Sequence, residues 1–364
     1  MAKALRLLWP AAVALLVAAS FTGVRLAHSG GDPLALATLG ERFGGGDPAG
    51  SEGYDGQFNY YIARDGEPDA VEPHLDVPAY RYQRILYPAL ARALALGDPA
   101  RIAWALPAIS LLAHFLGTLA VAAVLERCAL PAGYALVYGL WVGVVGPAGI
   151  DLSEPLAYGL AAAGFLCLMS GRPLVGSVAL TLALLSKETT VFFWLAAWLA
   201  AGLAGQRKAL AALSVGGLVF AAWQVWLWAR FGSAGIGSGG AGASGFEWLP
   251  FMGLARVAAV DVSVFVLLLT LLAPSILIPA VWGVFVAGQR LWRGDRGRES
   301  LALLLNAGVI AFLPFSTFRE PFAMVRLACG LVLAVTLFCA VLRWRRPLNY
   351  ALFWTAGLIL LARL

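Results

Sequence analysis

Long runs of apolar residues, separated by short charged or Gly/Pro-rich breaks, dominate the chain. A bilayer core about 30 Å thick needs roughly 20 mostly apolar residues in a helix. The pattern therefore predicts an all-α polytopic membrane protein, with residues 1–364 forming a single transmembrane domain. About eleven transmembrane helices are expected, at residues 7–27, 102–125, 129–149, 155–171, 173–186, 190–205, 209–229, 262–288, 301–316, 323–342 and 348–363. Two of them, 173–186 and 190–205, are short enough to be tilted, half-inserted or one broken helix.

The cations between these runs indicate which side of the membrane each loop occupies. If the N-terminus, with Lys3 and Arg6, is cytoplasmic, every inner loop contains at least one Lys or Arg, as the positive-inside rule requires. Residues 28–100 then form a long first outer loop that contains eleven of the twenty acidic residues. The first run could instead be a signal peptide ending near Ser20, but it continues far enough to span, which favours its retention.

The two long outer segments differ in character. In the first outer loop, residues 29–50 are rich in Gly and Pro, and residues 51–97 have helical spacing. Residues 84–96 are too short to span and are expected to form an interfacial helix, so the loop should contain short or interfacial helices. The second segment, residues 231–260, is expected to be an outer loop; its Gly/Ser-rich part is typical of a flexible connection or a lid.

Composition narrows the function. With 61% hydrophobic and 13% charged residues, a soluble domain is excluded. The basic residues are spread over short loops instead of forming one stripe, which argues against a nucleic-acid partner. The chain has no Walker A, His-Glu-x-x-His or Gly-x-Ser-x-Gly motif, which disfavours an ATP-driven pump, a zinc protease and an α/β-hydrolase.

Four polar clusters border the apolar runs, where ionisable groups are costly unless they have a partner or a role. All four fall on the outer side of a topology derived from loop cations alone, which points to a common site. They could also be ordinary loop residues, and Asp151 could equally well cap a helix. The clusters are Tyr54-Asp55-Gly56-Gln57, Asp151-Leu-Ser-Glu154, Ser186-Lys187-Glu188-Thr189, and Arg319-Glu320 with Arg326.

The residue types suit transfer of a sugar from a phosphate carrier. Asp55, flanked by Gly53 and Gly56, is the candidate general base for a sugar hydroxyl. The two glycines would let the backbone approach a substrate closely, and nearby aromatic side chains could stack on a sugar ring. Guanidinium groups bind phosphate oxygens bidentately. The candidate substrate-binding residues are Tyr54, Gln57, Tyr61, Arg81, Arg84, Glu154, Lys187, Glu188, Arg319 and Arg326.

Five segments carry a resemblance to a known family: Tyr54-Asp-Gly-Gln-Phe-Asn-Tyr-Tyr-Ile-Ala-Arg-Asp65, Tyr80-Arg-Tyr-Gln-Arg-Ile-Leu-Tyr-Pro88, Leu152-Ser-Glu-Pro-Leu-Ala-Tyr158, Leu185-Ser-Lys-Glu-Thr189 and Arg326-Leu-Ala-Cys-Gly330. Together they resemble a bacterial family of cell-surface glycopolymer formation proteins and, more distantly, the GT-C class of membrane glycosyltransferases. The resemblance extends over most of the chain, from the first outer loop to the tenth predicted span.

The resemblance implies a GT-C-like fold in the bacterial inner membrane and an enzyme that takes a sugar from a polyprenyl-phosphate carrier on the outer face, usually with inversion. It implies Asp55 as the acidic residue of the first outer loop, Glu154 and Glu188 as further polar site residues, and Arg326 near the lipid phosphate. The first loop lacks the Asp-x-Asp or adjacent acidic pair of many GT-C enzymes, so no metal ligand is assigned and a divalent cation stays an open alternative. The sequence after the last predicted helix is short, so the soluble outer domain that some relatives use to bind acceptors is not expected, and the acceptor stays unassigned.

The leading hypothesis is therefore a glycosyltransferase whose partners are a polyprenyl-phosphate-linked sugar, a glycan or lipid-linked acceptor, and the bilayer. A transporter or flippase of lipid-linked or polar substrates is the first alternative. Charges gathered at one face and the lack of internal repeats disfavour it. A non-catalytic scaffold of a polysaccharide assembly complex is the second alternative, because clustered Tyr, Arg and acidic side chains also suit a protein interface.

Overall fold

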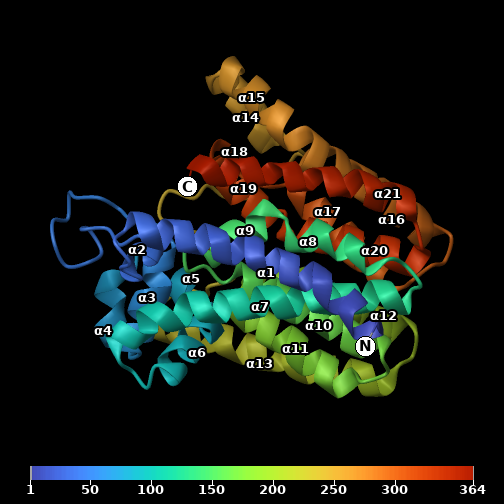
Figure 1. Cartoon of the computed structure of the whole chain (residues 1–364), viewed down its shortest axis with the longest axis horizontal. Coiled ribbons are helices and arrows are strands. Elements are labelled where there is room, and N and C mark those ends of the chain that lie inside the picture. The colour runs from blue at the N-terminus through green and yellow to red at the C-terminus, as the bar shows by residue number, and fades with distance from the viewer. Residues whose placement is uncertain (1, 364) are drawn as a thin grey trace.

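A computed structural model describes residues 2–363, and within that range all regular secondary structure is helical, with no strand. Five helical segments are long and apolar enough to cross a membrane: Leu5–His28, Pro99–Arg127, Arg207–Phe231, Val262–Trp292 and Pro321–Leu342. These segments indicate an integral membrane protein. Figure 1 shows α1 (Ala2–His28) and α7 (Pro99–Arg127) packed side by side along the long axis of the molecule.

Four further helices match predicted spans but are shorter. α10 (Glu154–Met169), α11 (Pro173–Ser186), α12 (Val191–Leu203) and α17 (Arg298–Ala311) contain 16, 14, 13 and 14 residues. At 1.5 Å per residue, each extends roughly 20–24 Å, which is less than the hydrocarbon thickness. The bounds of α11 coincide with those of the predicted short span 173–186. The chain is extended at Lys187, so the segments 173–186 and 190–205 form two separate helices.

Several apolar runs that look continuous in the sequence are interrupted. Residues 129–149 form η2 (Ala132–Ala135), α8 (Leu136–Gly139) and α9 (Val142–Ala148) instead of one helix. The chain is extended at Trp141, whose indole N–H donates to the carbonyl of Val325 at 2.8 Å. Hydropathy does not report such a break, because Trp and its neighbours are apolar.

Proline and local turns interrupt two other runs. Residues 262–288 form α15 (Val262–Leu272), the π-helical turn η4 (Ala273–Leu277) and α16 (Ile278–Trp292), because Pro274 and Pro279 cannot donate backbone hydrogen bonds. The segment 321–342 is divided at Ala328 into α19 (Pro321–Leu327) and α20 (Cys329–Leu342). The C-terminal run forms α21 (Arg345–Ala351) and the 3₁₀ segment η5 (Leu352–Arg363).

The first loop folds into short helices at the end of the molecule opposite the N-terminus (Figure 1). These are α2 (Leu34–Ala37), α3 (Gly56–Asp65), α4 (Pro68–Val71), η1 (Glu72–His74), α5 (Pro78–Tyr82) and α6 (Leu86–Leu94). Phe58, Tyr61 and Ile62, whose spacing predicts a helix, lie in α3 and are buried in an apolar core with Tyr87. The helical character predicted for residues 51–97 is therefore confirmed.

The second long loop begins where α13 (Arg207–Phe231) ends, at Gly232 in the left-handed conformation. The chain is irregular from residue 232 to 251 and then forms α14 (Met252–Val260), so the expected loop over 231–260 ends about nine residues early. The side-chain oxygen of Gln224 accepts hydrogen bonds from the backbone N–H groups of Gly235 and Ile236, which fixes the start of the loop. A short helix, α18 (Phe315–Arg319), lies between α17 and α19.

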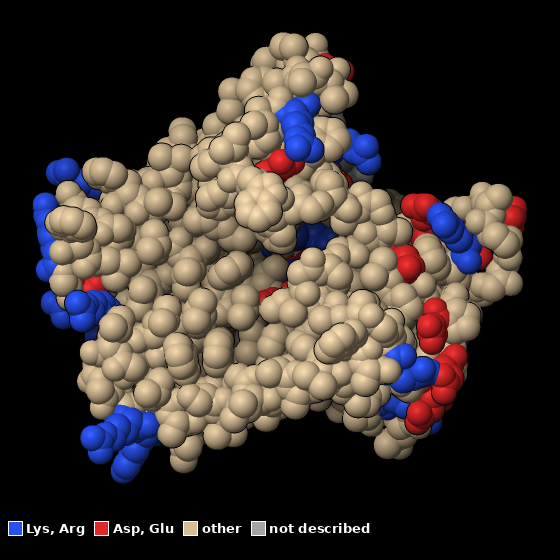
Figure 2. All heavy atoms as spheres, turned by 180° about the vertical axis from the view of Figure 1, so that it is seen from behind, with Lys and Arg blue, Asp and Glu red and all other residues tan. Residues whose placement is uncertain are grey.

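The distribution of charge matches a protein with an apolar belt. Figure 2 shows many charged side chains toward the two ends of the long axis and a few on and below the upper projection, with a broad, largely uncharged surface over the rest of this face. A hollow in that surface has Lys or Arg atoms inside it. The hollow is visible from the side of the helix bundle, so charged side chains inside the protein are reached laterally.

The contact between α3 and the turn before α10 leaves no room for a side chain at Gly56. A Cβ atom there would lie 2.4 Å from the carbonyl oxygen of Ile150. We expect Gly56→Ala to lower the free energy of unfolding by about 1–3 kcal/mol because the backbones must separate. Thermal melting of the purified protein measures the effect. Gly308→Ala, in α17 with open space around it, is the control and should be neutral or slightly stabilising; equal losses for both variants would refute the packing argument.

Candidate functional site

Charged residues from four separate parts of the chain meet around one cavity of about 780 Å³. They come from the first loop, from the turn between α11 and α12, from α18 and from α19. The cavity is lined by Arg42, Glu52, Asp55, Tyr80, Arg81, Arg84, Lys187, Glu188, Thr189, Gly240, Ala241, Gly242, Ala243, Ser316, Thr317, Arg319, Glu320, Ala323, Arg326 and Leu327.

Asp55 precedes the first residue of α3 and bridges two arginines. Its Oδ1 accepts from Nη1 of Arg81 at 2.8 Å, and its Oδ2 accepts from Nη1 of Arg326 at 2.8 Å. Its side chain is 26% exposed, whereas those of the two arginines are 9% exposed. Burial favours the neutral carboxyl, but attraction to Arg81 and Arg326 outweighs it and holds the pKa of Asp55 well below the ordinary value of 3.8. Asp55 is therefore a carboxylate.

Glu154, the first residue of α10, lies beneath the cavity and joins two other elements. Its Oε1 accepts from Nε of Arg326 at 2.7 Å and from Nζ of Lys187 at 3.0 Å. The side chain of Glu154 is fully buried and that of Lys187 is 5% exposed. The carboxylate thus ties α10 to α19 and to the turn between α11 and α12. Unlike Asp55, it does not line the cavity.

Arg84 forms a separate ion pair on the same wall. Its Nε and Nη2 donate to the two carboxylate oxygens of Glu188, at 2.9 and 2.7 Å. Nη2 also donates to the hydroxyl of Tyr80 at 2.6 Å, and the guanidinium lies 4.4 Å from the centre of that ring. This bidentate geometry fixes the planes of both side chains, so the position of Glu188 is set by the first loop.

The rim of the cavity combines the Gly-rich loop with α18 and α19. The backbone N–H of Ala241 donates to Oδ2 of Asp76 at 2.9 Å, and the hydroxyls of Ser244 and Ser316 are hydrogen-bonded at 3.1 Å. The loop therefore covers the cavity from one side, between the first loop and α18. Arg319 lines the cavity and is exposed, with its guanidinium 6.0 Å from the ring of Phe315.

The predicted site residues differ in how they meet the cavity. Asp55, Arg81, Arg84, Lys187, Glu188, Arg319 and Arg326 line it. Tyr54 lies at its edge, where its hydroxyl donates to Glu320 at 2.9 Å and accepts from Nη1 of Arg326 at 3.1 Å. Its ring packs 6.3 Å from that of Phe322.

Gln57 and Tyr61 do not reach the cavity, contrary to the expectation that they contact substrate. Gln57 is 1% exposed, accepts from the N–H of Gly40 and donates to the carbonyl of Glu52, so it holds the loop that precedes Asp55. Tyr61 is 1% exposed and packs against His74. Phe58 and Tyr60 are also buried, and their rings are unavailable for stacking on a sugar.

The two glycines beside Asp55 serve chain packing rather than close approach to a substrate. Gly56 abuts the carbonyl of Ile150, and Gly53 has a φ of +68° and lies against the backbone of Thr38 and Gly40. Tyr54 N–H donates to the carbonyl of Thr38 at 2.9 Å, which extends this contact. The glycines thus fix the place of Asp55 between the start of the first loop and the turn before α10.

Tyr80 and Glu320, which line the cavity, were absent from the predicted site, as was Asp76, which contacts the cavity residue Arg81. Asp76 accepts from Nε and Nη2 of Arg81 at 2.7 and 2.8 Å and orients that arginine. Tyr80 and Glu320 occur within segments singled out in the sequence, next to Arg81 and Arg319, so adjacency was an available signal. Asp76 lies five residues before Arg81 across a turn, so sequence adjacency did not indicate its contact with that arginine.

Asp55, Glu154 and Glu188 all form ion pairs with arginine or lysine. Among residues 2–363, no group of three or more His, Cys, Asp or Glu side chains is arranged to hold a metal ion. The carboxylates of Asp55, Glu154 and Glu188 each accept from at least one cation at 3.0 Å or less. This donor set does not fit a divalent cation, so no step is assigned to one.

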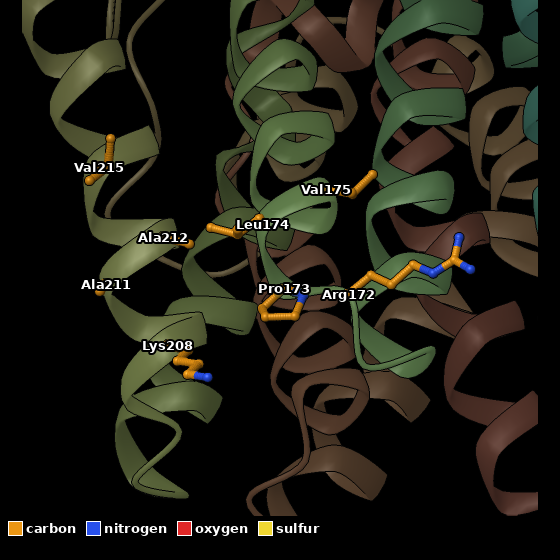
Figure 3. A pocket seen from close by; sticks show the side chains of 8 residues that line it. All are labelled: Arg172, Pro173, Leu174, Val175, Lys208, Ala211, Ala212 and Val215. Carbon is orange, nitrogen blue, oxygen red and sulfur yellow. The ribbon is translucent and has the colours of Figure 1, made fainter.

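An apolar groove lies apart from the charged cavity, between α11 and α13. Its wider part has a volume of about 710 Å³ and is shown in Figure 3. Leu174 and Ala212 lie across it from one another, Lys208 lies at its lower end in the view, and the side chain of Arg172 points away from α13. A second part, of about 360 Å³, continues along the same two helices to Leu185. Leu185 is two residues before Lys187 of the cavity.

Comparison with family models, curated proteins and solved structures gave no match for this chain. The site is therefore interpreted from its own geometry.

The double pairing of Glu154 leads to a stability prediction. Glu154→Gln leaves Arg326 and Lys187 buried without this counter-charge, and we expect a loss of about 3–5 kcal/mol in the free energy of unfolding. Thermal melting in detergent checks this. Adding Lys187→Met to the same chain should recover part of the loss, because one of the two uncompensated charges is removed.

The matched control for this series is Glu52→Gln. Glu52 pairs with Arg42 at 2.7 Å, but its side chain is 73% exposed, and such pairs contribute about 0–1 kcal/mol. Equal destabilisation by the two glutamine variants would show that the pairing of Glu154 is not the cause.

Proposed function

We propose that this chain is a membrane glycosyltransferase that moves a sugar from a polyprenyl-phosphate carrier to a cell-surface glycan or a lipid-linked acceptor, with inversion. One observation carries the proposal: Asp55 lies beside cations in a cavity of about 780 Å³ formed by segments far apart in the sequence. A carboxylate next to several guanidinium groups offers both a base and a phosphate-binding surface.

The apolar groove supports a lipid-linked donor. It runs along α11 and α13, and its lining is almost wholly aliphatic apart from Arg172, Ser177, Thr181 and Lys208. An isoprenoid chain in this groove would lie beside the 14 residues of α11, and its phosphate end would reach the turn that carries Lys187. The hollow visible from the side of the bundle in Figure 2, with Lys or Arg atoms inside it, supports lateral access for the phosphate end of such a lipid.

The proposed reaction is a single displacement at the anomeric carbon. The acceptor hydroxyl attacks that carbon, and the bond to the phosphate oxygen breaks on the opposite face. The polyprenyl phosphate leaves with the bonding electrons, and Asp55 takes the hydroxyl proton. Arg81, Arg84 and Arg326 would stabilise the charge that develops on the phosphate, which is the largest electrostatic demand of this chemistry.

The proposed orientation places the N-terminus in the cytoplasm of a bacterial inner membrane and the cavity at the outer face, within a GT-C-like arrangement of about eleven spans. Arg172 and Lys208, at the end of the groove remote from Lys187, would then face the cytoplasm as the positive-inside rule requires. The short helices would cross by tilting or by local thinning of the bilayer.

Replacing Asp55 tests the transferase. In proteoliposomes supplied with lipid-linked sugars extracted from a bacterial membrane and with Mg²⁺ and Mn²⁺, wild type should release polyprenyl phosphate in the presence of cell-envelope acceptors. Asp55→Asn should be slower by at least about 100-fold, because a positioned base contributes roughly 10²–10⁴. Mass spectrometry of the lipid products measures the rate.

Asp47→Asn is the control, because Asp47 is an exposed acid of the same loop, outside the cavity. It should retain the wild-type rate. The same vesicles report transbilayer movement of the lipid-linked sugar; movement without sugar transfer, unchanged in Asp55→Asn, would replace the transferase with a flippase.

A further inference from the structure

Asp55 and five other charged groups form one chain of alternating sign. In order they are Asp76, Arg81, Asp55, Arg326, Glu154 and Lys187, with every neighbouring pair 3.0 Å apart or less. Each arginine also pairs with a second carboxylate. Asp76 accepts from Nε and Nη2 of Arg81, and Glu154 accepts from Nε of Arg326. The remaining Nη1 groups of both arginines converge on Asp55.

Asp55 differs from Asp76 and Glu154 in its exposure and in its hydrogen-bond partners. Its side chain is 26% exposed and borders the cavity, whereas those of Asp76 and Glu154 are 6% and 0% exposed. Asp76 also accepts from the backbone N–H groups of Val77 and Ala241. Asp55 makes no capping hydrogen bond to its own helix, so its two arginine contacts are what hold the carboxylate in place.

Two guanidinium Nη1 groups that converge on a pair of oxygens form an anion-binding position. Phosphate oxygens accept from guanidinium groups in the same way as carboxylate oxygens. Because Asp76 and Glu154 keep both arginines oriented, this position would persist if the Asp55 side chain rotated away. Arg319, on the cavity wall and without an ion pair among the described residues, supplies a positive charge for an entering anion.

We propose that Asp55 is an internal occupant of the phosphate-binding position, and that the phosphate of an isoprenyl phosphate displaces it from the Nη1 groups of Arg81 and Arg326. The identity of the ligand rests on the proposed function. Released from two cations, the carboxylate turns into the cavity as a stronger base than it is in the structure described here. The site would thus activate its base only when the donor phosphate is bound, which limits proton abstraction in an empty site.

This arrangement makes an unusual prediction for binding. A carboxylate that contacts the sugar contributes to affinity, so its removal weakens binding of the ligand. A carboxylate that competes with the phosphate does the opposite. We therefore expect Asp55→Asn to bind farnesyl phosphate about tenfold more tightly than wild type does, measured by calorimetry on the full-length protein in detergent. Farnesol, which lacks the phosphate, should bind both proteins equally.

Removing any negative charge from the cavity also favours an anion, and the control must account for that. Glu320 lines the same cavity and forms no ion pair with Arg81 or Arg326; it accepts from the hydroxyl of Tyr54. Glu320→Gln changes the charge by the same amount without vacating the Nη1 groups. We expect its affinity for farnesyl phosphate to stay within about threefold of wild type.

The outcomes separate the alternatives. Unchanged or weaker binding by Asp55→Asn overturns the displacement, as does an equal gain in Glu320→Gln, which would reduce the effect to general electrostatics. Absence of farnesyl phosphate binding by wild type and all variants also overturns it. If Asp55→Asn does not fold, Asp55→Ser makes the same comparison. Tighter binding by Asp55→Asn together with no sugar transfer by wild type would retain the displacement and reject the transferase, whereas transfer without tighter binding would do the reverse.

Discussion

The fully buried carboxylate of Glu154 determines how the rest of the site is built. It lies at the start of α10 and accepts from both Arg326 of α19 and Lys187 of the turn after α11. Two charges left unpaired in such a place would each cost several kcal/mol, so these three elements have to meet at one point. The orientation of Arg326 that follows from this contact is also what directs its Nη1 at Asp55.

Charge pairing in this site therefore operates at two levels. Buried pairs such as those of Glu154 fix helices against one another, and their partners cannot exchange without disturbing the bundle. The pairs of Asp55 at the cavity wall involve a partly exposed carboxylate, and its two arginine partners are oriented by other carboxylates. Arg81 shows both levels in one side chain, because Asp76 takes two of its donors and Asp55 the third. A rigid inner set of ions makes an exchangeable outer set possible.

Hydropathy and the alternation of loop cations predicted the class of fold and brought distant polar clusters to one side, because both depend on properties that each residue carries alone. The helical character of residues 51–97 followed from the spacing of Phe58, Tyr61 and Ile62 in the same way. Interruption of apolar helices at Trp141 and Ala328 could not be predicted, since it depends on contacts with α19 and α9 and leaves hydropathy unchanged. The eleven predicted spans thus correspond to five long helices and a set of shorter ones.

In the site, too, features that depend on single residues could be predicted, whereas features that depend on tertiary contacts could not. Charged residues next to apolar helices, such as Glu154, Lys187 and Arg326, pair with one another at or beside the cavity, because desolvation forces such groups to find partners. Gln57 and Tyr61 were assigned by adjacency to Asp55, but successive residues at the start of a helix point in different directions, and these two face the packed interior of the first loop. Asp76 is the opposite case. It is not adjacent to Arg81 in the sequence, but a turn brings the two side chains together across four intervening residues. Sequence adjacency therefore identifies the segment that reaches a site, whereas the direction of each side chain depends on which face of that segment the bundle buries.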